Sequence, residues 1–215
     1  MQVKIFSYRY AKEILEHPNY SDAYEEVISI CKACPLPVYK DKSKSQSSLD
    51  VVQQIINTYF KIAFSKKEWE EEPLVTPESL DDSLRGDFRK RFSKDDNHIA
   101  IQIEVEMGNI ASSYRNYFKF QLSYAHKLAD IAILILPCDA LSRRIDSGVA
   151  SYEKTVREIP SADLSITVPI LVIGLDDSAV EEIDIKSIEE DLEIVKGQKN
   201  KYKSEHIDLV KRLVS

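Results

Sequence analysis

Residues 101–118 read IQIEVEMGNIASSYRNYF, and this stretch decides the fold class. Aliphatic side chains occupy every second position from Ile99 to Val105, which is the period of a β-strand whose two faces differ. Gly108 and Asn109 then indicate a turn, and a helix is expected over residues 112–127. A strand that leads through a turn directly into a helix, without a hairpin, is typical of an α/β protein.

The rest of the chain also alternates helices with strands. Residues 129–137 (ADIAILILP) and 167–175 (TVPILVIGL) are apolar runs of strand length, as in central strands covered on both faces. The first half reads as helical up to an irregular acidic stretch. Apolar spacing predicts helices over residues 10–17, 22–33, 49–64, 139–145 and 149–159. This order predicts an α/β fold, with a central mixed sheet flanked by helices on both sides.

One domain is expected for residues 1–215, because a chain of 215 residues with 43% hydrophobic content can bury one large core. From about residue 184 the sequence is charged and predicts a helical extension, which Gly197 divides into two pieces. Residues 40–48, KDKSKSQSS, form a polar basic loop. This loop is either solvated or lies along a phosphate backbone.

The composition limits the class of protein. No run of about 18 apolar residues occurs, and the N-terminal residues lack the pattern of a signal peptide, so a cytosolic protein is expected. Cys31, Cys34 and Cys138 are interpreted as free thiols. The formal net charge of −7 argues against a protein that only coats nucleic acid. It does not exclude a nuclease, because carboxylates that bind a metal ion also add negative charge.

Three carboxylates are candidates for chemistry. Glu104 and Glu106 are two residues apart, so a strand would place them on one face with Cα atoms roughly 6 to 7 Å apart. Asp87 lies seventeen residues before Glu104 and follows Gly86. Such pairs commonly lie on a solvated face. Alternatively, Asp87 and Glu104 would bind Mg²⁺ and Glu106 would deprotonate a water molecule, which is the chemistry of a phosphodiester hydrolase.

The spacing D-x16-E-x-E resembles the PD-(D/E)XK nuclease core, and E-V-E-M-G-N-I-A-S-S-Y-R is similar to the BamHI, BglII and BstYI group of type II restriction endonucleases. Further similar segments reach to about residue 175. They are Y-A-K-E-I-L, A-Y-E-E-V, D-F-R-K-R-F, A-H-K-L-A-D-I-A-I-L-I-L-P, S-G-V-A-S-Y-E and V-P-I-L-V-I-G. The resemblance implies a restriction-endonuclease-like αβα core.

The resemblance also implies roles for single residues. Asp87 and Glu104 correspond to metal-binding carboxylates, and Glu106 to a general base. The carbonyl of Val105 would complete the metal shell. Glu71 falls near an upstream acidic ligand, although Glu70 is an alternative. Gly86 replaces the usual proline of the motif.

Two segments correspond to residues that read bases in the major groove. The first segment comprises Asn109, Ala111, Ser112 and Arg115; the second comprises Asp146, Ser147 and Gly148. Arginine suits this role because its guanidinium can pair with guanine O6 and N7. The group as a whole implies palindromes with GATC at the centre, and the second segment leaves the outer base pair open.

A palindromic target implies a two-fold symmetric homodimer. The stripe Tyr114, Phe118, Leu122 and Ala125 of the helix expected at 112–127 is a candidate for the interface, with core packing as the alternative. His126 and Asp163 correspond to an ion pair across the dimer, although a histidine at a helix end can also be only a favourable dipole contact.

The sequence therefore predicts a Mg²⁺-dependent homodimeric endonuclease that cuts double-stranded DNA at a short palindrome, leaves 5′-phosphate ends and acts beside a cognate DNA methyltransferase. Two alternatives remain open at this point. One is a repair or modification-dependent nuclease of the same fold, and the other is a DNA-binding module without catalysis.

Overall fold

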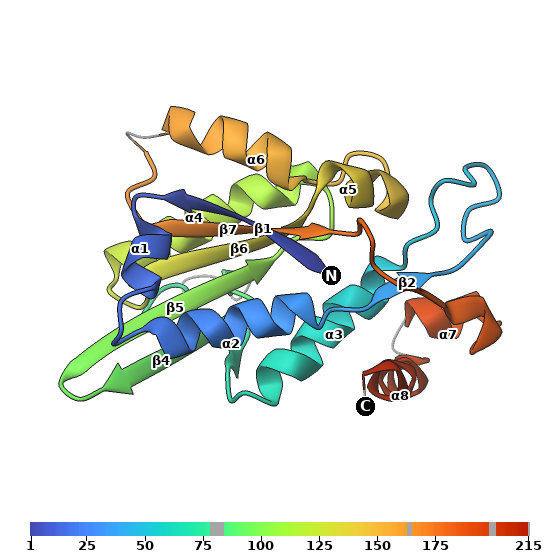
Figure 1. Ribbon diagram of the computed structural model, residues 1–215, viewed down its shortest axis with the longest axis horizontal. Helices are drawn as coiled ribbons and strands as arrows, with labels where there is room; N and C mark the ends of the chain where they lie inside the picture. The colour runs from blue at the N-terminus through green and yellow to red at the C-terminus, as the bar shows by residue number, and fades with distance from the viewer. Residues whose placement is uncertain (78–83, 163–164, 198–200, 215) are drawn as a thin grey trace.

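The computed structural model describes residues 1–77, 84–162, 165–197 and 201–214. A six-stranded sheet with the order β1-β7-β6-β5-β4-β3 runs through the centre (Figure 1). β5, β6 and β7 are parallel, whereas β1, β4 and β3 are antiparallel to their neighbours. The strand bounds are β1 (Gln2–Tyr8), β3 (Glu70–Glu71), β4 (Phe88–Lys94), β5 (Asn97–Val105), β6 (Ile131–Pro137) and β7 (Ile170–Asp176). The predicted mixed sheet is confirmed.

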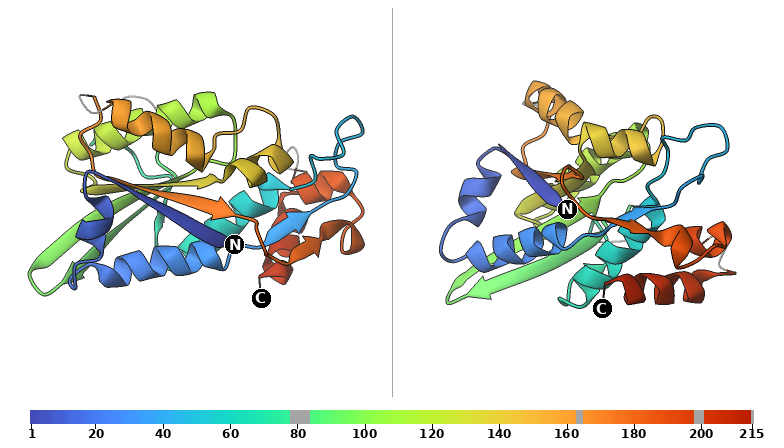
Figure 2. Two further views of the ribbon diagram at one scale, coloured as in Figure 1. Left: turned by 45° about the horizontal axis from the view of Figure 1, so that its top comes forward. Right: turned by 45° about the vertical axis from the view of Figure 1, so that its right-hand side comes forward.

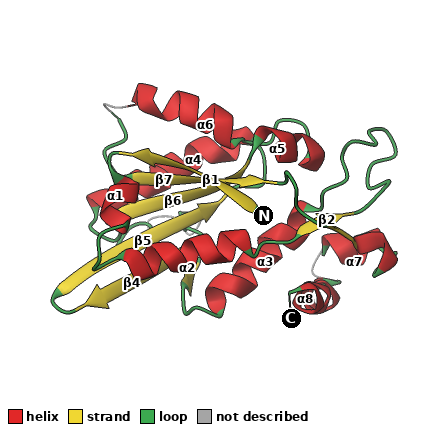
Figure 3. Ribbon diagram, viewed as in Figure 1, coloured by secondary structure: helices red, strands yellow, loops and turns green. Residues whose placement is uncertain are grey.

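Helices cover both faces of the sheet, as predicted (Figures 2 and 3). In β6, the side chains of Ile131, Ile133 and Ile135 join the core on one face, and those of Leu134 and Leu136 join the core on the other. The first face is covered by α1 (Ala11–Leu15), α2 (Ser21–Lys32) and α3 (Gln53–Ser65), and the second by α4 (Ile110–Ala125) and α6 (Tyr152–Glu158). α5 (Asp139–Ile145) follows β6. Each large aliphatic side chain buried in this way contributes about 1.5 to 3 kcal/mol to the hydrophobic stabilisation of the fold.

The first half of the chain was expected to be helical, and this expectation is wrong for the residues that form β1 and β4. β1 pairs with β7 in an antiparallel ladder, and β4 pairs with β5 from Phe88 opposite Ile103 to Lys94 opposite Asn97. The sequence of β4, FRKRFSK, is half exposed and carries no continuous apolar run. These strands form because they pair with β7 and β5, and the local sequence pattern does not reveal such pairing partners.

The residues of the expected C-terminal extension form mostly helices. β8 (Glu182–Asp184) pairs with β2 (Leu36–Val38), and α7 (Leu192–Lys196) and α8 (Lys203–Leu213) follow. Gly197 ends α7 with a φ of 59°, a left-handed conformation that glycine adopts without strain. The buried His206 of α8 hydrogen-bonds to Thr58 Oγ1 of α3 at 2.8 Å, so the extension packs on α3.

The three cysteines are buried free thiols, as expected from their small number. In the part of the chain that the structure describes, no helix has both the length and the apolar character needed to span a membrane.

Candidate active site

Three carboxylates gather where β5 ends. Because β4 and β5 are antiparallel with Phe88 opposite Ile103, the residue before β4, Asp87, lies beside the end of β5. The amide of Val105 donates to Asp87 Oδ2 at 2.7 Å. Asp87, Glu104 and Glu106 line one cavity of about 290 Å³, called here the acidic cavity. Residues that are nearly twenty positions apart in the sequence therefore form one cluster.

Glu104 at the end of β5 and Glu106 just after the strand are both buried, so the alternative of a solvated face is wrong. Glu104 is 1% exposed and Glu106 is 9% exposed. Burial, together with the nearby charge of Asp87, raises the pKa of Glu104 to about 8, whereas Lys119 and Gln102 act in the opposite direction. Burial also raises the pKa of Asp87 and of Glu106. In all three carboxyl groups burial is the largest cause, because the charged form loses its solvation by water.

Helix α4 closes the acidic cavity with a buried polar stripe. The ammonium of Lys119, which is 9% exposed, forms an ion pair with Glu104 Oε2. Asn116 Nδ2 donates to Glu106 Oε2 at 3.2 Å, and the amide of Gly108 donates to Glu106 Oε1 at 2.9 Å. Both oxygens of Glu106 are therefore oriented by the turn and the helix that follow it.

Sequence reasoning missed Asn116 and Lys119 as members of the site. Their signal is the spacing of Asn116, Lys119 and Ser123, which places three polar residues on one stripe of a helix. In the structure this polar stripe is the buried face of α4.

A second layer of hydrogen bonds fixes Glu104. Gln102, which is fully buried on the same face of β5, donates from Nε2 to Glu104 Oε1 at 3.2 Å. Gln102 Oε1 accepts from Ser123 Oγ at 2.5 Å and from Arg89 Nη2 at 3.0 Å. A Cβ at Gly86 would lie 2.9 Å from Gln102 Nε2 and 3.1 Å from Glu104 Oε1. The glycine before Asp87 therefore leaves room for these two side chains.

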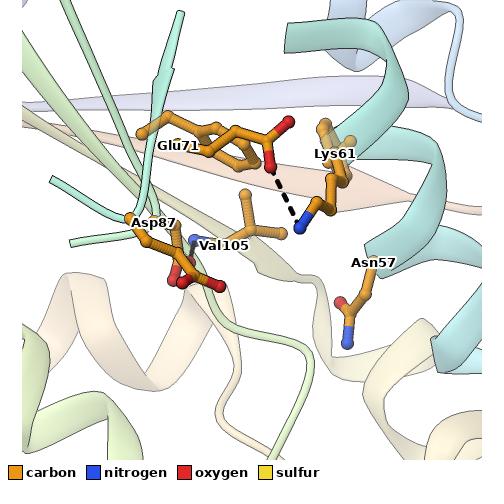
Figure 4. A pocket seen from close by; sticks show the side chains of 8 residues that line it. Asn57, Lys61, Glu71, Asp87 and Val105 are labelled. Atoms are coloured by element: carbon orange, nitrogen blue, oxygen red, sulfur yellow. Dashed lines mark hydrogen bonds and ion pairs between the residues drawn. The ribbon is translucent and has the colours of Figure 1, made fainter. Parts of the chain in front are cut away.

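Glu71 lies in a neighbouring cavity of about 230 Å³ that shares Asp87 and Val105 with the acidic cavity. Figure 4 shows Glu71 pointing towards Lys61, whose ammonium lies 2.9 Å from Glu71 Oε2. The hydroxyl of Ser65 and, less strongly, the ammonium of Lys61 lower the pKa of Glu71. The alternative residue, Glu70, lines a different cavity, so of the two glutamates Glu71 is the one beside Asp87.

The oxygen atoms around the acidic cavity supply some of the ligands that a hard divalent cation needs. Within residues 1–77, 84–162, 165–197 and 201–214, no three acidic, histidine or cysteine side chains form a complete metal-binding group. Asp87 and Glu104 supply carboxylates with raised pKa values. The amide of Val105 faces Asp87, and in a strand the carbonyl of a residue points to the same edge as its amide. Mg²⁺ commonly keeps several waters, so two carboxylates and one carbonyl suit it.

The two expected base-reading segments lie next to each other. Asn109 and Val149 form a β-bridge, and the amide of Ile110 donates to the carbonyl of Gly148 at 2.9 Å. Asn109 Oδ1 caps α4 by accepting from the amide of Ala111 at 2.8 Å, and Ser112 lies in the first turn of the helix. The exposed members are Asn109, Ala111, Arg115, Asp146, Ser147 and Gly148. Arg115 also lines the acidic cavity, so this surface adjoins the carboxylates.

The apolar stripe of α4 faces outward, so the alternative of core packing is wrong for its first half. Tyr114 is 52% exposed and Phe118 is 55% exposed. His126 is the exposed C-cap of the helix. Asp163, its expected partner across the dimer, lies outside the described residues.

Comparisons of the sequence with known proteins all find restriction endonucleases. The sequence model of the family described as restriction endonuclease BglII/BglIII matches residues 3–175. The type II restriction enzyme BamHI of Bacillus amyloliquefaciens is 26% identical over 179 residues, which is 79% of this chain and 81% of BamHI.

Two crystal structures of BglII share the fold. The complex with a DNA 16-mer has a TM-score of 0.64 at 22% identity, covering 82% of this chain and 77% of that chain. Free BglII has a TM-score of 0.50 at 21% identity, covering 81% of this chain and 79% of that chain. Because the family match spans most of the sequence, this chain belongs to the BglII/BglIII family of restriction endonucleases.

Proposed function

We propose that this protein is a type II site-specific endonuclease that hydrolyses double-stranded DNA at a short palindrome with GATC at its centre and leaves 5′-phosphate ends. The observation that carries the proposal is the acidic cavity, which the half-buried Asp87 and the buried Glu104 and Glu106 line together beside an exposed pair of loops. The family membership and the complex of BglII with a DNA 16-mer support the choice of substrate. A cognate DNA methyltransferase would protect the host's own copies of the site.

The residues divide the chemistry among them. Asp87, Glu104 and the carbonyl of Val105 would hold Mg²⁺, with Glu71 as a further ligand once its ion pair with Lys61 opens. When bound, the cation would stabilise negative charge on the phosphoryl group. Glu106 would accept a proton from the attacking water, and its raised pKa brings it closer to neutral pH, where a general base is most effective.

The groups around Glu106 keep its carboxylate in place. Gly108 and Asn116 each donate one hydrogen bond to it, so both oxygens are held before a substrate arrives. Lys119 offsets part of the charge of Glu104 while the ion is absent. Pre-organised donors of this kind reduce the rearrangement that the reaction requires.

Base reading would be carried out by the first turn of α4 and the adjoining loop. Asn109, Ala111, Ser112 and Arg115 would face the major groove together with Asp146, Ser147 and Gly148. The main-chain hydrogen bonds between the two segments fix their relative positions. Arginine reads guanine, and a carboxylate such as that of Asp146 can accept from the amino group of cytosine.

A two-fold homodimer would form through α4. The helix buries its polar stripe in the acidic cavity and exposes Tyr114, Phe118 and Tyr124. Exposed aromatic side chains on one helix face are typical of a protein interface. His126 and Asp163 would form an ion pair across this interface. A dimer would present two acidic cavities to the two strands of a palindrome.

The test is a digest of supercoiled, unmethylated plasmid DNA with Mg²⁺, followed by run-off sequencing of the ends. Discrete fragments that end at one palindrome containing GATC are expected. Smearing, or cleavage only of methylated or branched DNA, would instead indicate a repair or modification-dependent nuclease. Tight sequence-specific binding without hydrolysis by any divalent ion would indicate a binding module.

A further inference from the structure

The basic loop of residues 40–48 lies against the second base-reading segment, although about a hundred positions separate them in the sequence. Lys42 Nζ donates to the carbonyl of Ile145 at 2.9 Å and to the carbonyl of Val51 at 2.5 Å. Ile145 directly precedes Asp146, so Lys42 fixes the loop beside that segment. Figure 2 shows the loop projecting from the end of the molecule that carries α5 and the C-terminal helices.

Between the loop and the segment lies a polar cavity of about 490 Å³. Ser43, Ser45 and Gln46 line it from the loop, and Asp146 and Ser147 line it from the segment. Gln53, at the start of α3, also lines it. The Oε1 atom of Gln53 is buried and has no hydrogen-bond partner within the described part of the chain. Hydroxyl and amide groups in this arrangement suit a polar ligand rather than an apolar one.

The charge of the loop is positive, even though the whole chain carries −7. Asp41 is paired with Lys186 of the extension at 3.2 Å, which neutralises the carboxylate of the loop. Lys40 and Lys44 are exposed, and no carboxylate in the described ranges forms an ion pair with them. α7 adds Lys196, which also lines the polar cavity.

Lys42 and Lys196 line the same polar cavity and influence one another. Burial lowers the pKa of Lys42, and the charge of Lys196 lowers it too, while Asp146 and Asp50 act in the opposite direction. An anion placed beside this group of lysines would therefore be attracted.

Ion pairs connect Arg144, which precedes the second base-reading segment, to residues just after the basic loop and just before the extension. Arg144, two residues before Asp146, pairs with Asp50 at 2.9 Å, with Asp177 at 2.9 Å and with Glu182 at 2.7 Å. Asp177 and Glu182 lie beyond residue 175, where the family match ends. Carboxylates outside the shared family region thus hold Arg144 at the start of the base-reading segment, and the Asp41–Lys186 pair joins the basic loop to the extension.

We propose that Lys40, Lys44 and Lys196 form a second DNA-contacting surface, which binds the phosphates of duplex DNA that flanks the bases read by residues 146–148. The inference rests on the proposed function and adds to it a contact outside the recognition sequence. Phosphate contacts of this kind strengthen binding without reading sequence. Lys42 has the different role of holding the loop, because its ammonium is already bound to two carbonyls.

The test compares a Lys40→Gln/Lys44→Gln double variant and a Lys196→Gln variant with the wild type. Binding of metal-free protein is measured over a range of salt concentrations, on one duplex with long flanks and on one trimmed to the palindrome. Each phosphate contact that is lost should reduce the slope of log K against log salt by about 0.9 on the long duplex. On the trimmed duplex the variants should match the wild type.

A Lys12→Gln/Lys94→Gln double variant serves as the matched control. Its lysines belong to α1 and to the end of β4, and α1 and the β4–β5 turn lie at the opposite end of the molecule from the loop (Figure 1). It should keep the wild-type slope on both duplexes. If the variants of the basic loop and of Lys196 keep the wild-type slope on the long duplex, the inference is overturned and the proposed function is unaffected. A wild type that binds neither duplex would overturn the proposed function.

Discussion

Glu104→Gln should stabilise the metal-free protein in a pH-dependent way. Burial of the Glu104 carboxyl raises its pKa from 4.5 to about 8, so the folded protein binds this proton more tightly than the unfolded chain does. The free energy of unfolding of the wild type should therefore fall as pH rises from about 4.5 to about 8. Glutamine has the same shape and does not titrate, and its oxygen can still accept from Lys119.

The magnitude follows from the difference between about 8 and 4.5. At about 1.4 kcal/mol per pH unit, the raised pKa lowers the stability of the fold, relative to acid pH, by ~3 kcal/mol near pH 7 and by ~5 kcal/mol above pH 8. This is a large fraction of the ~5 to 15 kcal/mol by which a typical domain is stable. The advantage of the variant over the wild type should grow by these amounts across the same pH range.

The assay is urea unfolding in EDTA at several pH values, with the exposed Glu25→Gln as a control that should parallel the wild type. Addition of Mg²⁺ should stabilise the wild type above about pH 7 and have little effect on Glu104→Gln. Parallel pH profiles for wild type and Glu104→Gln would refute the reasoning, because they would show that the buried charge does not destabilise the fold.

Three further variants test other parts of the site. Glu106→Gln should slow single-turnover cleavage by about 10² to 10⁴ while DNA affinity stays unchanged; a smaller loss would argue against a general base. Lys119→Met removes the ammonium beside Glu104 and should lower the free energy of unfolding in EDTA by about 3 to 5 kcal/mol well above pH 8, where Glu104 of the wild type is ionised, whereas unchanged unfolding there would show that the ion pair is not needed. If the proposed dimer forms through α4, Phe118→Asp should sediment as a monomer, and a variant that remains dimeric would place the interface elsewhere.

The sequence predicted the elements whose pattern is local. β5 alternates between two faces, and β6 and β7 are continuous apolar runs, so both the strands and their depth in the sheet could be read from the side chains. The spacing of Asp87, Glu104 and Glu106 in the sequence also predicted that these three carboxylates act together. β1 and β4 could not be predicted in this way, because their stability comes from pairing with β7 and β5.

The residues that contact the carboxylates could also not be predicted from local sequence patterns. Lys119 looks like a solvated helix residue in the sequence, and it becomes part of the cavity only because α4 packs its polar stripe on β5. The positions of Lys42 and Arg144 likewise depend on contacts between segments that are about a hundred residues apart. Such contacts are set by the tertiary structure and leave little trace in a single sequence.

We propose that DNA is cut at the acidic cavity and that the loops beside it bind DNA independently of cutting. The most direct measurement compares wild type and Glu104→Ala in two assays, namely plasmid cleavage with Mg²⁺ and binding of a cognate duplex in EDTA. The account predicts discrete fragments from the wild type, no cleavage by Glu104→Ala, and similar DNA affinities for both proteins. Cleavage by Glu104→Ala at the wild-type rate would contradict it.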